Sequence, residues 1–177
     1  VTGVIFNAFY DFALSPIELV KLAQQAENDF VGVKCGIMDQ FIIGLGKKDH
    51  AVLLDTTTLD YTYAKVDLDR YALLITNTNK KRELAESKYN ERFDECQRAL
   101  CDLKTVVPIE SLGDLTQEVF ECHALAIKDP VARRRARHAV TENERTIKAC
   151  IALNEGRLID FGLLMNESHY SLKHDYE

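Results

Sequence analysis

The sequence predicts an α+β fold in which helices back an antiparallel sheet. Three short strand-like runs follow one another at residues 51–55, 61–66 and 71–76, with a threonine-rich turn after the first. The gaps between these runs are too short for a crossover helix, so we expect the strands to pair mainly antiparallel. From residue 89 onwards apolar residues recur at helical spacing, which indicates that the second half of the chain is helical.

A helix is expected before the strands. Ser15 can cap it, Pro16 suits the first helical position, and Glu18 can reach back to the backbone of the cap. This pattern predicts a helix that runs from Pro16 towards Ala26.

Three features are expected in the helical half. The first helix of this half should bury one apolar stripe. Its residues are Tyr89, Phe93, Cys96, Leu100 and Leu103. A later helix through Val140 and Ile151 should end at Gly156, and a last one should follow from Leu158. The arginine run at 133–135 is expected to form a solvated helix face.

Composition excludes several classes of protein. The net charge of −6 over 177 residues gives no general case for nucleic acid, and no apolar stretch is long enough to span a bilayer. Five cysteines without a Cys-x-x-Cys pair predict reduced thiols in a cytosol, with neither disulfides nor a zinc site. Because the sequence starts at Val1 without a signal-peptide pattern, we expect it to begin part-way along a longer chain.

Asp39 is the residue most suggestive of chemistry. It follows an apolar segment at 30–33 and Gly36, and it opens a helical pattern that Gly44 and Gly46 are expected to end. A carboxylate at such a junction can be partly desolvated and aimed into a cleft, which suits a base that takes a proton from a hydroxyl. By position alone, a helix cap or a lysine partner is the simpler interpretation.

Five segments change that balance, because together they resemble the galactokinases, of the superfamily that also holds homoserine, mevalonate and phosphomevalonate kinases. They occur in the family's order and cover nearly the whole chain. The two most specific are Gly-Ile-Met-Asp-Gln and Ser-x-Tyr-Asn-Glu-Arg. The segments are 26–40, 46–51, 79–92, 135–143 and 161–177.

The resemblance implies a two-lobed sugar-kinase fold, with residues 1–60 at the end of the N-terminal lobe and 61–177 in the C-terminal lobe. It implies ATP-dependent phosphorylation of the anomeric hydroxyl of galactose, with magnesium. The family's arginine, its phosphate loop and a third glycine-rich motif have no match here, so no nucleotide-binding residue is assigned. We therefore expect the chain to be inactive alone.

The same resemblance assigns four site residues. Asp39 matches the catalytic aspartate, and Gly36 the glycine whose backbone approaches the sugar. Tyr89 matches the tyrosine that hydrogen-bonds galactose, and Glu27 the carboxylate associated with magnesium. By pattern alone, Tyr89 also fits the buried stripe and Glu27 is an ordinary acid at a helix end.

Two other functions are also compatible with these segments. One is a non-catalytic relative that binds sugar and nucleotide as a sensor for a transcriptional partner. The other is a kinase for N-acetylgalactosamine, which differs in pocket residues largely outside this sequence.

Overall fold

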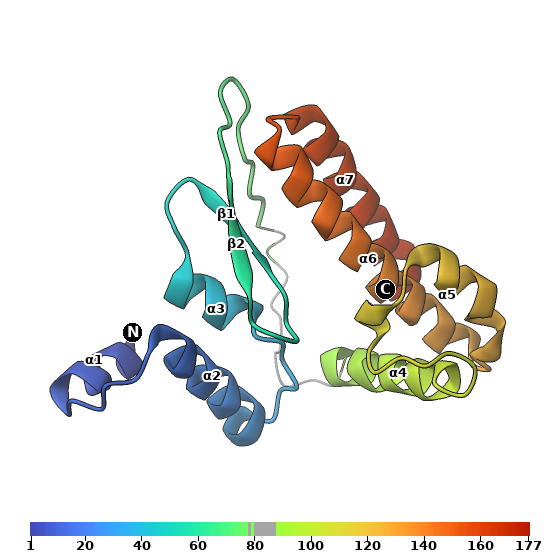
Figure 1. The fold of residues 1–177 in the computed structure, drawn as a ribbon, viewed down its shortest axis with the longest axis horizontal. Helices are drawn as coiled ribbons and strands as arrows, with labels where there is room; N and C mark the ends of the chain where they lie inside the picture. Colours follow the sequence, from blue (N-terminus) through green and yellow to red (C-terminus); the bar gives the residue numbers. More distant parts are fainter. Residues whose placement is uncertain (78, 80–87) are drawn as a thin grey trace. The chain divides into compact units, whose positions relative to one another are not determined.

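The structure, a computed structural model, describes residues 1–77, 79 and 88–177 (Figure 1). They divide into two compact units: Val1–Lys65 with Tyr71–Tyr89, and Val66–Arg70 with Asn90–Glu177. Helices and one antiparallel pair of strands confirm the predicted α+β class. The lobe boundary expected after residue 60 stays a prediction, because compactness alone does not assign these units to kinase lobes.

In the first unit, the helix predicted from Pro16 begins where the sequence places it. The Ser15 hydroxyl accepts a hydrogen bond from the Glu18 amide at 3.3 Å, and the Glu18 carboxylate accepts one from the Ser15 amide at 2.7 Å. This reciprocal cap confirms the predicted helix start. The helical elements of the unit are α1 (Thr2–Phe9), α2 (Pro16–Ala26), the π-helical turn η1 (Glu27–Val31) and α3 (Met38–Leu45).

Two strands form the sheet of the first unit. Strand β1 (His50–Leu54) pairs antiparallel with β2 (Tyr61–Lys65), which confirms two of the three expected strands and their direction. The third, at 71–76, is wrong, because these residues follow no regular structure. Leu74 and Ile75 are 87% and 86% exposed, and an apolar run forms a strand only beside another strand that completes its hydrogen bonds.

The core of the first unit holds α3 in place. Val20 of α2 and Ile37 and Phe41 of the α3 segment are at most 7% exposed and pack together. The ring of Phe41 also meets Tyr61 of β2 edge-on, with the two centroids 5.2 Å apart. The start of α3 is therefore fixed against both α2 and the hairpin.

Gly44 lies inside α3 and does not end it, in contrast to the prediction. The helix ends at Leu45, and Gly46 is the residue that caps it. A Cβ atom on Gly44 would lie 2.6 Å from Cγ2 of Val20, so the glycine is needed for the close approach of α2 and α3.

We expect Gly44→Ala to destabilise the chain despite the better helix propensity of alanine. The clash with Val20 should cost about 1–3 kcal/mol, against a propensity gain of about 1 kcal/mol. Gly162 is the matched control, because it lies within a helix and a Cβ there would meet nothing within 4 Å. In urea unfolding, Gly162→Ala should be stabilising; equal effects of both substitutions would contradict the packing argument.

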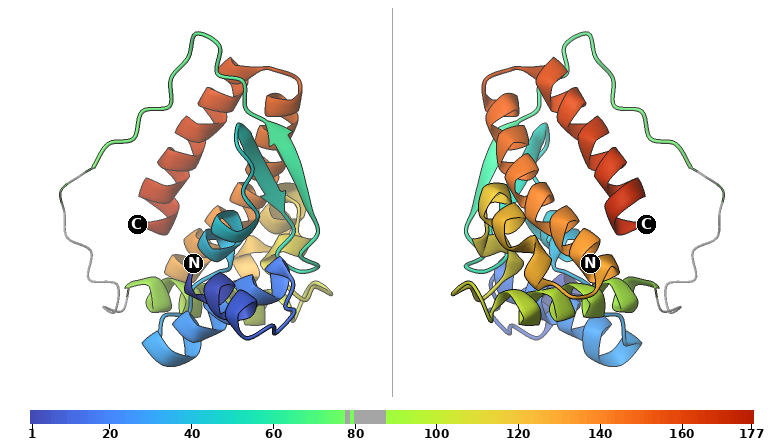
Figure 2. Two further views of the ribbon diagram at one scale, coloured as in Figure 1. Left: turned by 90° about the vertical axis from the view of Figure 1, so that its left-hand side faces the viewer. Right: turned by 90° about the vertical axis from the view of Figure 1, so that its right-hand side faces the viewer.

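The second unit is almost wholly helical. Its core joins α4, α5 and α6 through Leu103, Phe120, Ile127 and Ala136, each fully buried. Helices α6 and α7 run side by side (Figure 2), and Gly156 with φ +69° follows the end of α6 as predicted. The elements are α4 (Lys88–Leu103), η2 (Leu112–Asp114), α5 (Gln117–His123), η3 (Ala124–Ala126), α6 (Pro130–Asn154), α7 (Leu158–Ser171) and η4 (Leu172–Tyr176).

The buried face of α4 differs from the predicted stripe. Tyr89 is 51% and Phe93 40% exposed, while Arg92 and Glu95 are buried. The buried positions are Arg92, Glu95, Ala99 and Leu103. The prediction holds for Leu103 and is wrong for Tyr89 and Phe93. It placed residues inside by apolar type, whereas here two charged side chains are buried with partners from distant helices.

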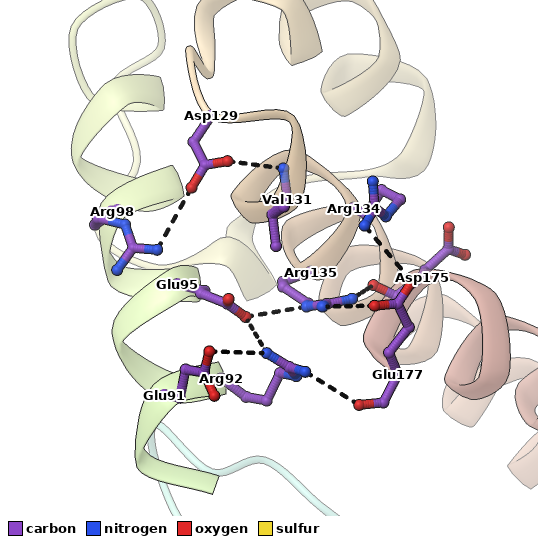
Figure 3. A network of polar contacts seen from close by, with 10 residues as sticks. All are labelled: Glu91, Arg92, Glu95, Arg98, Asp129, Val131, Arg134, Arg135, Asp175 and Glu177. Carbon is purple, nitrogen blue, oxygen red and sulfur yellow. Dashed lines mark hydrogen bonds and ion pairs between the residues drawn. The ribbon is translucent and has the colours of Figure 1, made fainter. Parts of the chain in front are cut away.

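Those partners form the network in Figure 3. The Glu95 carboxylate accepts hydrogen bonds from Arg92 at 2.8 Å and from Arg135 of α6 at 3.0 Å. Arg135, only 2% exposed, also donates to the Asp175 carbonyl at 2.5 Å and to the Glu177 carboxylate at 3.2 Å. The expected solvated face at 133–135 is therefore wrong for Arg135, whose charge is balanced inside the unit.

The five cysteines are all free thiols. In the described parts of the chain, no helix combines the length and the apolar character that a membrane crossing needs.

Candidate active site

Asp39 occupies the first turn of α3. Ile37, the residue before the helix, makes no side-chain cap, and within the described residues the Asp39 carboxylate forms no hydrogen bond or ion pair. Among the residues that the structure describes, neither the cap nor the lysine partner of the simpler interpretation is present. The backbone amides of the first helical turn favour a negative charge at this point.

The side chain of Asp39 is exposed. The sequence pattern suggests a partly desolvated carboxylate at this position, so the structure differs from that expectation. The reason lies in the helix face. Ile37 and Phe41 occupy the buried side of α3, and Asp39, two residues from each, faces away from it. The carboxylate is thus available to a ligand.

Gly36 and Tyr89, 53 residues apart, meet in space. The Gly36 amide donates a hydrogen bond to the Tyr89 hydroxyl at 3.3 Å. A Cβ atom on Gly36 would meet nothing within 4 Å, so the packing of this chain does not require glycine there. The open side of Gly36 leaves its backbone accessible, three residues before Asp39.

The turn before Gly36 is held by Cys35. Its carbonyl accepts a hydrogen bond from Gln24 of α2 at 3.2 Å, and its thiol donates to the Asn28 side chain of η1 at 3.2 Å. Burial, and then the nearby Glu27 carboxylate, raises the pKa of the Cys35 thiol, which keeps it protonated as a donor. Cys35 therefore acts here as an anchor for the turn.

Glu27 begins η1 and is half-buried. Its carboxylate accepts a hydrogen bond from the Gln40 side chain at 2.7 Å, so it lies beside the residue that follows Asp39. Among the described residues, no group of three or more His, Cys, Asp or Glu side chains could hold a metal ion. Mg²⁺ is commonly bound by one or two carboxylates together with phosphates and water, and a single carboxylate fits that pattern.

The first unit thus gathers the four sequence-predicted residues around one turn and the start of α3. Sequence reasoning missed Gln40, which lies next to Asp39 in the Gly-Ile-Met-Asp-Gln segment. Its partner Glu27 is 13 residues earlier, so only the approach of η1 to α3 reveals its contact.

Comparison with known proteins agrees with this picture. The family described as "GHMP kinases N terminal domain" matches residues 1–47. The chain is 56% identical to the galactokinase of Clostridium acetobutylicum over 176 residues and 51% identical to that of Bacillus subtilis over 175. Both matches cover 99% of this chain and 45% of the relative, so the chain spans about half the length of these proteins.

A solved structure gives the same result for the fold. The crystal structure of Lactococcus lactis galactokinase complexed with galactose matches with a TM-score of 0.95 and 47% identity. The match covers 99% of this chain and 45% of that one. This chain is therefore a homologue of the galactokinases over almost its whole length, with the fold of the corresponding part of such an enzyme.

Proposed function

We propose that this chain forms part of a kinase that phosphorylates galactose at its anomeric hydroxyl with ATP, giving galactose 1-phosphate. The observation that carries the proposal is the arrangement around Asp39. An exposed carboxylate without a partner among the described residues lies three residues after a glycine amide that meets a tyrosine hydroxyl. The similarity to a galactokinase that was crystallised with galactose supports the choice of sugar.

In this proposal Asp39 takes or orients the proton of the sugar hydroxyl that attacks the phosphate. Asp39 lies in the first turn of α3, where the backbone amides favour a negative charge. Gly36 offers its backbone to the sugar without a side chain in the way, and Tyr89 offers a hydroxyl that can donate to a sugar oxygen.

Glu27 is the residue that would hold magnesium. A carboxylate suits this hard cation, and the hydrogen bond from Gln40 fixes the orientation of the group. When bound, the ion would offset the negative charge of the ATP phosphates. We also propose a cytosolic location, which the five free thiols support.

A chimera tests the proposal. Residues 1–177 would replace the equivalent segment of the L. lactis galactokinase, and ADP release would be followed with galactose, ATP and magnesium. Galactose-dependent ADP release supports the proposal. Galactose binding without ADP release would favour the sensor and would replace the proposal.

We expect Tyr89→Phe in this chimera to raise the KM for galactose. The substitution keeps the ring but removes the hydroxyl, and an unpaired sugar hydroxyl costs about 1–2 kcal/mol, or roughly 5- to 30-fold. Tyr170→Phe makes the same change at an exposed residue of α7 and should leave the KM unchanged. An unaltered KM in Tyr89→Phe would remove this tyrosine from the sugar site.

The 177-residue chain alone should release no ADP. The segment 44–48 is rich in glycine and lysine, but it spans the end of α3 and precedes a strand, whereas a phosphate loop lies between a strand and a helix. Aromatic side chains around α1 should also make the chain prone to aggregation, since Phe9 is 77% and Tyr10 59% exposed. Coupled ADP assays and light scattering check both points; turnover above the blank would reveal an unrecognised phosphate site.

A further inference from the structure

The side chain of Gln40 lies between two parts of the proposed site. Its amide nitrogen donates to the Glu27 carboxylate at 2.7 Å and lies 3.8 Å from the Cys35 sulfur. It thus joins the proposed magnesium ligand to the turn that presents the Gly36 amide. Its backbone neighbour in α3 is Asp39.

The other end of the Gln40 amide is unsatisfied. Its oxygen Oε1 is buried, and it has no hydrogen-bond partner in the described part of the chain. A buried acceptor without a donor is unfavourable, and buried amide oxygens normally bind a protein group or an ordered water. The site therefore has a place for a donor that the described residues do not supply.

The chemistry requires an amide rather than an acid at this position. A glutamine can donate to the Glu27 carboxylate, whereas a glutamate of the same size would place a second negative charge against it. The Gln40 donor therefore favours one orientation of the Glu27 carboxylate.

We propose that Gln40 is a positioning residue of the kinase site, which orients Glu27 for magnesium and ties it to the Cys35–Gly36 turn. The inference rests on the proposed function and deepens it. Gln40 acts through Glu27 and the turn, and its buried oxygen would be able to accept a hydrogen bond from a water molecule. Groups that orient a metal ligand in this way typically change metal affinity 10- to 100-fold when they are lost.

The first test needs no kinase activity. In Gln40→Glu, two carboxylates would share one space, so the folded-state pKa of one of them rises above that of the unfolded chain. The variant should be as stable as the parent in acid, where the pair holds a proton, and should lose stability as the pH rises through the raised folded-state pKa. Melting temperatures of the chain between pH 4 and 8, followed by circular dichroism at low concentration, measure this.

Gln25→Glu is the matched control, because it makes the same change at an exposed residue of α2. Its melting temperature should not acquire a new pH dependence of this kind. If Gln40→Glu behaves like Gln25→Glu at every pH, the amide does not lie against Glu27 and the inference is overturned.

The second test uses the galactokinase chimera. Gln40→Leu removes both hydrogen bonds without adding charge, and it should raise the magnesium concentration for half-maximal rate at least about 10-fold at all pH values. Gln40→Glu should show the same defect near pH 8 and a smaller one in acid. An unchanged magnesium requirement in both variants, with an active parent chimera, overturns the positioning role alone. An inactive parent chimera overturns the proposed function, and the inference with it.

Discussion

Asp39→Asn should abolish turnover in the galactokinase chimera while most of the affinity for galactose remains. Asparagine keeps the shape of the side chain but cannot accept a proton from the sugar hydroxyl, and loss of a general base typically costs about 10²- to 10⁴-fold in rate. Because the Asp39 carboxylate makes no hydrogen bond or ion pair within the described residues, the substitution removes no structural contact there. Steady-state kinetics and calorimetric titration with galactose separate the two effects.

Asp49→Asn is the control for this result. Asp49 is exposed and has φ +57°, a left-handed conformation that asparagine adopts as readily as aspartate. The control should keep the parent rate. Near-normal turnover in Asp39→Asn would remove this carboxylate from the chemistry.

Glu95→Gln should be the most destabilising of the substitutions that we consider. The carboxylate accepts hydrogen bonds from the buried Arg92 and Arg135, and removing one member of a buried charge cluster costs about 3–5 kcal/mol. Glu121→Gln is the matched comparison. Glu121 accepts two hydrogen bonds from Arg137, at 2.8 and 2.9 Å, but this pair is partly exposed and should contribute at most about 1 kcal/mol.

The pH dependence of stability tests the contribution of the Glu95 charge. Burial alone would raise the pKa of Glu95, but hydrogen bonds from Arg135 and Arg92 outweigh it and hold the pKa below its usual value. Because this folded-state pKa lies below that of the unfolded chain, Glu95 stabilises the fold above about pH 4.3. That contribution is lost as the pH falls through the folded-state pKa.

Urea unfolding of the 177-residue chain at several pH values measures both effects. The difference in the free energy of unfolding between the wild type and Glu95→Gln should be largest near pH 7 and should become smaller in acid. If Glu95→Gln and Glu121→Gln lowered the free energy of unfolding equally, burial of the cluster would make no additional contribution to stability.

Local chemistry made parts of the fold predictable. The cap formed by Ser15 and Glu18 depends on residues three apart, so the start of α2 follows directly from the sequence. The hairpin was predictable for the same reason, since β1 and β2 are neighbours along the chain. The third strand at 71–76 failed because an apolar run becomes a strand only if another strand lies beside it.

Partners distant in sequence explain the other errors. Arg92 and Glu95 lie outside the predicted apolar stripe, and their burial depends on partners such as Arg135, 40 residues beyond Glu95. The close approach of α2 and α3 likewise decides the role of Gly44. Periodicity cannot supply this information, because it describes one helix at a time.

The residues of the candidate site could be predicted only from the resemblance of longer sequence segments to a family. No local pattern connects Gly36 with Tyr89, and the helical stripe favoured a buried tyrosine; the family resemblance placed both near the sugar. The family resemblance did not assign a role to Gln40, because the role of a glutamine depends on the orientation of its amide relative to its partners.

The Glu95 cluster also sets the register between α4 and α6. If α4 slid by one turn, Ala99 would take the place of Glu95 opposite Arg135, and several charges would lose their partners inside the unit. An apolar contact between the same helices would tolerate such a shift at much lower cost. The cluster should therefore discriminate between alternative alignments of the two helices, so that replacing it with apolar side chains preserves the helices but loosens their alignment.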